Sequence, residues 1–278
     1  PAAAAAAALL EGLADAEGPI LVVCDFDGTL AAIHPDPAGA TLDPAARRAL
    51  RHLGRLARAR PERLALAILS GRTALDVAGR VRIGGLTYLG DHGLQGGVLP
   101  PGVPGERLPV AHADRHAAHA AASRRLGDDV GRLLADADWL YVEPKGPSVA
   151  FHYRTADDPA AARDRILAAL GAASEALPAE LREPRFDRLE TWRIVEVRPE
   201  GAGAKGAAVE ELIARHRAAA VAVLGDDVTD AEAFRAVMAA RAAGRLAAAV
   251  AIGVRRGAET PIEVERGADA LLPGPEAV

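Results

Sequence analysis

The stretch DFDGTL at residues 25–30 constrains the fold and chemistry of this chain more than any other segment. It directly follows an apolar, β-branched run at residues 20–24, which predicts a buried strand. Alternate residues of an extended segment point the same way, so Asp25 and Asp27 can share one site. Two buried carboxylates repel each other, and a hard cation such as Mg²⁺ relieves the repulsion. The stretch therefore predicts a magnesium site at the end of a buried strand.

The next two residues of the stretch suit a phosphate group. Gly28 lets the backbone approach a ligand closely, and Thr29 offers a hydroxyl and an N–H. The plain alternative is an acidic turn after a strand, because Asp-Gly is common in turns. The position of the whole hexapeptide behind an apolar strand favours the ligand site.

Composition excludes several classes of function. The chain has 278 residues, enough for one large or two modest domains, and its 3% aromatic content requires aliphatic cores. The net charge of −5 and the lack of a Lys/Arg-rich run argue against nucleic-acid and membrane partners. The single cysteine, Cys24, indicates a reducing, cytoplasmic compartment. The Ala-rich residues 1–10 lack a basic start and are too short to span a bilayer, so we expect a helix there.

Lysine is rare in this chain. Of the 33 basic side chains only Lys145 and Lys205 are lysines, and the others are arginines. Two lysines retained among so many arginines indicate sites that need a compact ammonium group, although chance is the alternative explanation.

Apolar runs alternate with helical segments on both sides of the chain's middle region, which predicts an α/β fold with a doubly wound, mainly parallel sheet. Parallel strands place their carboxyl ends at one edge, so the polar residues that follow them are expected to meet there. Ser70 and Gly71, before a helix, suit a phosphate. The expected strands lie at residues 20–24, 64–69, 86–89, 220–224, 248–252 and 270–272, and the polar groups after them include Asp226, Asp227 and Asp230.

The middle region predicts a small α+β domain with the order α-β-β-α-β-β. We expect an inserted domain at residues 106–198 between two parts of the first domain, at residues 1–105 and 199–278. Pro/Gly-rich joins at residues 100–109 and 199–203 are candidate hinges. Within the insert we expect helices at residues 111–137 and 159–176 and strands at residues 139–142, 148–153, 185–189 and 193–197.

These motifs together resemble those of the haloacid dehalogenase-like phosphohydrolases, and in more detail those of trehalose-6-phosphate phosphatases. The resemblance covers residues 20–235. It rests on DFDGTL at 25–30, SGR at 70–72, GDHG at 90–93, EPK at 143–145, SVAFHYR at 148–154, EVRP at 196–199, KG at 205–206 and GDDVTD at 225–230 with Glu232 and Phe234.

The resemblance implies a Mg²⁺-dependent phosphatase that works through an aspartyl-phosphate, with the insert as a C2-type cap. Asp25 would be the nucleophile and Asp27 the acid and base. The phosphoryl group would lie against Gly28, Thr29, Ser70, Gly71 and Lys205. The metal would take Asp25, the backbone carbonyl of Asp27 and Asp226, supported by Asp227 and Asp230. The sugar would contact Arg72, His92, Glu143, Lys145, Arg154 and Glu196.

Several alternatives stay open at this point. The charged residues of the insert could be cross-strand ion pairs on a solvated sheet face. The substrate could be a sucrose- or mannosyl-phosphate. The chain could also be a phosphosugar mutase or a non-catalytic sugar-phosphate sensor. The oligomeric state and the role of residues 111–137 are left undetermined by the sequence.

Overall fold

The structure is a computed structural model that describes residues 2–112, 117–200 and 204–278. The chain divides into two compact units. The first comprises Pro1–His34, Ala40–Ala111 and Ala204–Val278, and the second comprises Pro35–Gly39 and His112–Gly203. No helix among the described residues has both the length and the apolar character needed to cross a bilayer.

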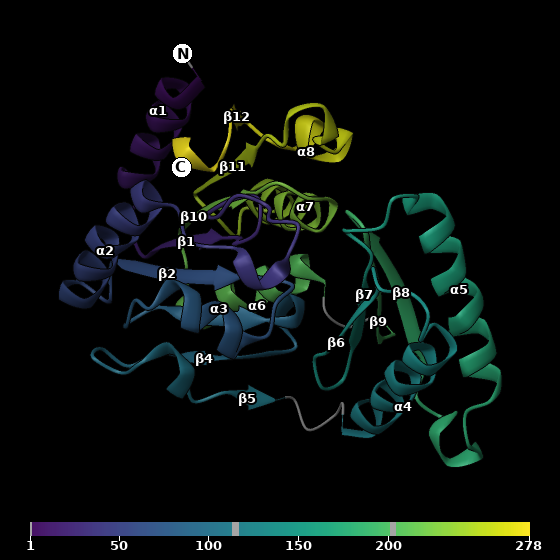
Figure 1. The fold of residues 1–278 in the computed structure, drawn as a ribbon. Coiled ribbons are helices and arrows are strands. Elements are labelled where there is room, and N and C mark those ends of the chain that lie inside the picture. The colour runs from purple at the N-terminus through teal and green to yellow at the C-terminus, as the bar shows by residue number, and fades with distance from the viewer. Residues whose placement is uncertain (1, 113–116, 201–203) are drawn as a thin grey trace. The chain divides into compact units, whose positions relative to one another are not determined.

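The first unit is built on an eight-stranded sheet with the order β12-β11-β10-β1-β2-β3-β4-β5 (Figure 1). The strands from β12 to β3 pair in parallel, and β4 pairs antiparallel to β3. This confirms the expected α/β fold with a mainly parallel sheet. The strands are β1 (Ile20–Cys24), β2 (Leu64–Leu69), β3 (Thr87–Gly90), β4 (Gln95–Val98), β5 (Ala111–His112), β10 (Ala220–Gly225), β11 (Ala248–Val254) and β12 (Ala270–Leu272).

Helices cover both faces of this sheet, because its central strands are apolar on both sides. In β1, Leu21 and Val23 belong to one buried cluster, while Cys24 belongs to the other. The helices of this unit are α1 (Ala2–Ala14), α2 (Pro44–Ala59), α3 (Ala74–Val81), α6 (Lys205–His216), α7 (Val228–Ala242) and α8 (Ile262–Gly267).

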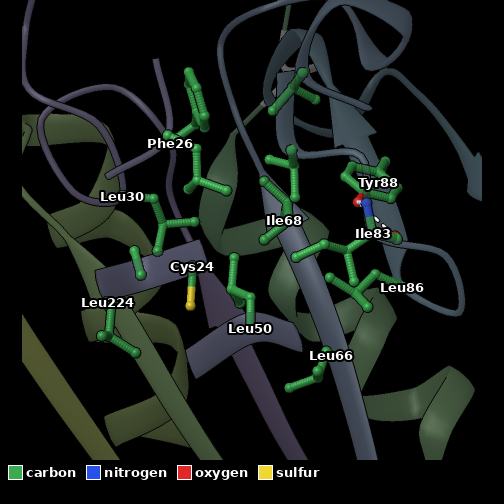
Figure 2. Close-up of a cluster of buried hydrophobic side chains, with 14 of the residues drawn as sticks. Cys24, Phe26, Leu30, Leu50, Leu66, Ile68, Ile83, Leu86, Tyr88 and Leu224 are labelled. Atoms are coloured by element: carbon green, nitrogen blue, oxygen red, sulfur yellow. Dashed lines mark hydrogen bonds between the residues drawn. The ribbon is translucent and has the colours of Figure 1, made fainter. Parts of the chain in front are cut away.

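Aliphatic side chains fill the core on the side of α2 and α3 (Figure 2). Its one tyrosine, Tyr88, is fully buried, and its hydroxyl is satisfied by the backbone. That hydroxyl donates to the Ile83 carbonyl at 2.7 Å and accepts from the Ile83 N–H at 3.3 Å. These bonds fix the loop between α3 and β3 against the sheet.

The second unit contains a four-stranded antiparallel sheet with the order β6-β7-β9-β8. Side chains of α4 and α5 share one buried cluster with Phe151 and Val195 of the sheet. The order α-β-β-α-β-β is as expected. The elements are α4 (Ala117–Leu133), β6 (Tyr141–Pro144), β7 (Val149–His152), α5 (Pro159–Glu175), β8 (Phe186–Thr191) and β9 (Ile194–Pro199).

Three expectations about individual elements were wrong. Ala111 and His112 form β5 instead of starting a helix, since strand pairing overrides the helix propensity of alanine, and α4 ends at Leu133. Residues 113–116 lie outside the described part of the chain. The sequence also gave no sign of β4, which carries two glycines. At Gly97 a Cβ would lie 2.0 Å from the Pro109 carbonyl oxygen, so close backbone packing explains the glycine.

We expect Leu86→Ala to lower the free energy of unfolding of the first unit by about 2–5 kcal/mol, because the fully buried Leu86 would leave a cavity. Leu75→Ala is the matched control, since that side chain is 43% exposed on α3. Urea unfolding of both variants measures the difference. Equal losses would contradict the packing described here.

Candidate active site

The carboxyl ends of the neighbouring parallel strands β10, β1 and β2 bring together the polar residues that follow these strands. Cys24 of β1 lies in register with Leu224 of β10 and Ile68 of β2, so the residues just beyond these strands adjoin. Asp25 donates its backbone N–H to the Leu224 carbonyl at 3.0 Å. The polar residues that follow these strands therefore lie close together in the first unit, as expected.

Lys205 is the charged centre of this group. Its Nζ donates to Asp25 Oδ1 at 2.6 Å and to Asp230 Oδ1 at 2.7 Å, and all three side chains are buried. Burial lowers the pKa of Lys205, but Asp230 and Asp25 outweigh burial and raise the pKa above its usual value. The lysine is therefore a permanent cation between two carboxylates.

Thr29 holds the side chain of Asp226, and Asp230 holds its backbone. Thr29 Oγ1 donates to Asp226 Oδ1 at 2.9 Å, and the backbone N–H groups of Asp226 and Asp227 both donate to Asp230 Oδ2 at 3.1 Å. Gly28 has a φ of +89°, and a Cβ on it would lie 2.0 Å from Asp226 Oδ2. Only glycine at this position leaves room for the carboxylate.

These carboxylates fit a hard divalent cation such as Mg²⁺. Oxygens of Asp25, Asp226 and Asp230 lie within 4.8 Å of one another, and Asp226 Oδ2 is buried with no hydrogen-bond partner among the described residues. Asp230 already uses its oxygens on Lys205 and on backbone N–H groups. Asp25 and Asp226 are therefore the side chains left to bind a metal, and the donor set is all oxygen.

Without a bound cation, the pKa values of the buried carboxylates Asp25 and Asp226 are raised. Burial raises the pKa of Asp25 to about 7, because Asp230 and Asp27 add to burial and together they outweigh Lys205. Burial and the neighbouring Asp25 and Asp230 raise the pKa of Asp226 well above its usual range. A bound cation would favour the ionised form of both carboxylates.

Arg72 contacts the second aspartate of the first motif. Its Nε lies 2.6 Å from Asp27 Oδ2 and its Nη2 donates to Asp27 Oδ1 at 2.7 Å, a two-pronged arrangement that fixes the carboxylate plane. Its Nη1 donates to Asp76 Oδ2 at 2.8 Å, and its guanidinium lies over the Phe26 ring. Arg72 thus holds Asp27 in this structure, and the sugar contact that the resemblance implies for it stays a prediction.

The ends of β2 and β3 are tied together at Ser70 and His92. The His92 N–H donates to the Ser70 carbonyl at 3.0 Å, and Ser70 Oγ accepts from the Arg72 N–H at 3.2 Å. Asp91 and His92 both have left-handed φ angles, +51° and +53°. Such backbone in non-glycine residues is costly and concentrates at functional sites. A Cβ on Gly71 would lie 3.0 Å from the His92 ring, so glycine permits this contact.

The second unit carries a separate polar cluster on its sheet. Lys145 Nζ donates to Glu196 Oε2 at 2.6 Å, and His152 Nε2 lies 2.8 Å from Glu143 Oε2. Ala150 pairs with both Glu143 and Glu196, which places the two glutamates in one row. Phe151, the next residue, belongs to the core shared with α4 and α5, so this row lies on the opposite face of the sheet.

The neighbouring Lys145 and His152 keep Glu143 ionised. Burial raises the pKa of Glu143, but Lys145 and the hydrogen bond with His152 outweigh it, so the pKa is lowered overall. Burial lowers the pKa of His152 despite the Glu143 carboxylate. The guanidinium of Arg154 lies over the Trp192 ring. The cluster therefore offers a fixed acceptor, Glu143, and a fixed donor, Lys145.

Arg256 is a residue of the site that sequence reasoning missed. It follows β11, the neighbour of β10, and its side chain is only 9% exposed. Its Nε lies 3.3 Å from Asp226 Oδ2, and its Nη2 donates to Asp227 Oδ1 at 3.2 Å. The sequence signal that could have indicated Arg256 was its position just beyond an expected strand of the parallel sheet.

The charge count of the described site leaves room for one divalent cation. Five carboxylates contribute negative charge: Asp25, Asp27, Asp226, Asp227 and Asp230. Three cations oppose them: Arg72, Lys205 and Arg256. With all five carboxylates ionised, the excess is two negative charges, which a single divalent ion balances.

Comparisons with known proteins agree with this geometry. The family model described as trehalose-phosphatase matches residues 23–260. A trehalose-phosphate phosphatase of Mycobacterium avium is 36% identical over 78% of this chain and 51% of its own length. The chain thus spans about half the length of that relative.

Two solved structures share the fold. The C-terminal domain of the Candida albicans trehalose-6-phosphate phosphatase has a TM-score of 0.73 at 18% identity, covering 97% of this chain and 92% of that chain. A sucrose-phosphatase of Synechocystis, solved with sucrose and phosphate, has a TM-score of 0.53 at 17% identity, covering 94% of this chain and 95% of that chain. At these identities the likeness concerns the fold.

We expect Arg256→Ala to destabilise the metal-free protein by roughly 3–5 kcal/mol, because it leaves Asp226 buried without its counter-charge. Arg255→Ala is the control, since Arg255 is half exposed and 3.9 Å from its partner Glu265. Urea unfolding in EDTA compares the two variants. A loss no larger for Arg256→Ala than for the control would contradict a charge-balancing role.

The raised pKa of Asp25 also predicts how stability varies with pH. Between its ordinary value of 3.8 and about 7, the native state binds more protons at Asp25 than the unfolded state does. The stability that Asp25 contributes to the metal-free protein therefore falls as pH rises through this range. Unfolding in EDTA at a series of pH values should show this fall, and Asp25→Asn should make it shallower. An unchanged slope in the variant would contradict the assignment.

Proposed function

The chain belongs to the trehalose-phosphatase family, and from this premise we propose that it hydrolyses trehalose 6-phosphate to trehalose and phosphate. The observation that carries the proposal is the buried group of Asp25, Lys205 and Asp226 at the carboxyl edge of the sheet. It combines a nucleophile, a phosphate-binding cation and a metal ligand in one place, as phosphoryl transfer requires.

In the first proposed step, the Asp25 carboxylate attacks phosphorus and the ester bond to the sugar oxygen breaks. Asp27 gives its proton to that oxygen, which leaves as a hydroxyl, and an aspartyl-phosphate forms. In the second step Asp27 takes a proton from water, which attacks the phosphorus and releases phosphate. Asp25 is then free again. Arg72 fixes the position of the Asp27 side chain, and Asp27 would carry the proton once this ion pair opens.

The proposed phosphate contacts are donors that are already in position. Lys205 supplies a buried positive charge, and Ser70 lies at the end of β2 ahead of α3. Thr29 and Gly71 would offer backbone N–H groups near these side chains. The Gly28 N–H donates to the Ala31 carbonyl at 2.7 Å, so Gly28 would contribute by letting the phosphate approach the backbone closely. Such fixed donors stabilise the charge that spreads over the phosphoryl oxygens in the transition state.

We also propose Mg²⁺ as the cofactor. Asp25 and Asp226 would hold it together with the backbone carbonyl of Asp27, while Asp227 and Asp230 shape the loop around them. When bound, it would act as a Lewis acid that neutralises charge on the phosphoryl oxygens.

The second unit would recognise the sugar. Glu143, Lys145 and Glu196 lie on the sheet face opposite its helices and present acceptors and a donor together, which sugar hydroxyls require. Arg154 and His92 are further proposed contacts. We propose a cytoplasmic location as well, supported by the single free cysteine, which lies buried.

Phosphate release from trehalose 6-phosphate, sucrose 6-phosphate and glucose 6-phosphate tests this proposal. We expect Mg²⁺-dependent release from the trehalose ester above the other two. Asp25→Asn should lower turnover by about 1,000-fold or more, because it removes the nucleophile. Asp128→Asn, at an exposed position of α4, is the control and should keep full activity.

Two outcomes would overturn separate parts of the proposal. Turnover retained by Asp25→Asn would refute the nucleophile, whatever the substrate. Equal release from all three esters, or none from trehalose 6-phosphate, would refute the substrate while leaving a phosphatase in place.

A further inference from the structure

Four arginines line a cavity of about 240 Å³ in the first unit. Among the described residues they are the only charged ones that line it, although the chain as a whole carries a net charge of −5. Such a concentration of one sign of charge in a hollow attracts an anion. The lining residues are Arg51, Arg55, Arg58, Arg82, Ile83, Gly84, Pro101 and Gly102.

This cavity lies at the edge of the sheet opposite the candidate active site. Arg58 is in the last turn of α2, which precedes β2, and β2 runs from there towards Ser70. Arg82 follows α3, which begins near Ser70 and returns to the start of β3. The cavity is therefore near the amino ends of β2 and β3, and Asp25 is at the carboxyl end of β1.

Two of the arginines, although exposed, are anchored to backbone carbonyls. Arg58 Nη1 donates to the Gly84 carbonyl at 2.9 Å, and Arg82 Nε donates to the Gly79 carbonyl at 2.6 Å. Position 84 needs a glycine, because a Cβ on Gly84 would lie 2.6 Å from Pro101 Cα. The positive charges of Arg58 and Arg82 are thus held in place before any ligand arrives.

The other two arginines, Arg51 and Arg55, are exposed one turn apart on α2. Neither has an ion-pair partner among the described residues. Like charges at this spacing repel each other, and Arg58 continues the same helix face. An anion with several negative charges would relieve this repulsion, and guanidinium groups bind phosphate oxygens in pairs.

The hollow continues beyond Arg82 into a second cavity of about 520 Å³ that ends at Glu106. Glu106 lies 3.6 Å from Arg82, so the positive charge is strongest at the α2 end. We propose that this cavity binds the diphosphate or triphosphate group of a small molecule, with the phosphates at α2. The proposal does not depend on the proposed phosphatase function.

Calorimetric titration of the metal-free protein with tripolyphosphate, pyrophosphate and ADP tests the site. Metal-free protein is the right form, because no divalent cation is then present to bind the polyphosphate or to carry it to the candidate active site. We expect saturable binding of one tripolyphosphate per chain, weakened about tenfold or more in the double variant Arg51→Gln, Arg55→Gln. Arg48→Gln is the matched control, an exposed arginine of α2 outside the cavity, and should bind as the unaltered protein does.

Comparing the three ligands also shows whether the site recognises a nucleotide or the phosphate group alone. Tighter binding of ADP than of pyrophosphate would support a nucleotide, and equal binding would support the phosphate group alone. Three results would overturn the proposal: no saturable binding, equal weakening in the control and the double variant, or unchanged binding in the double variant. Circular dichroism of both variants checks that α2 is intact.

Discussion

Buried carboxylates repel one another at one edge of the sheet in the first unit, and the structure there depends on the positive charges that offset this repulsion. Asp25, Asp226 and Asp230 bring their oxygens within 4.8 Å of one another, where three negative charges would be strongly unfavourable. Lys205 relieves part of this repulsion through two short ion pairs, and Arg256 relieves another part. The surrounding sequence follows from this arrangement: Gly28 makes room for Asp226, and Thr29 fixes one of its oxygens.

The parallel sheet makes such an arrangement possible. Its strands contribute buried apolar residues over their length and polar ones only where they end, so the stabilising core and the reactive groups do not compete for positions. The second unit uses a different sheet for a different task. Its antiparallel strands bury Phe151 against helices and carry Glu143 and Glu196 on the other face. Under the proposed function, the reaction would take place on the first unit and sugar hydroxyls would bind to the second.

Much of this architecture could be predicted from the sequence, because its signals are local. The run at residues 20–24 is β1, and the lysine at the start of α6 reaches Asp25. What could not be predicted depends on tertiary contacts. Arg256 is 30 positions from Asp226, and Arg255 shares its place just beyond β11, so the sequence alone does not single it out. The pairing of Arg72 with Asp27 joins two motifs that each have a sufficient local explanation. β4 was missed because its glycines serve close backbone packing and leave no apolar pattern.

In our proposal, one divalent cation completes the group of carboxylates at the edge of the sheet. Calorimetric titration of the metal-free protein with Mg²⁺ tests this proposal, with Asp226→Asn as the comparison. We expect one Mg²⁺ per chain, a melting temperature that rises with Mg²⁺ concentration, and loss of both effects in the variant. Absence of saturable Mg²⁺ binding, or equal binding by Asp226→Asn, would contradict it.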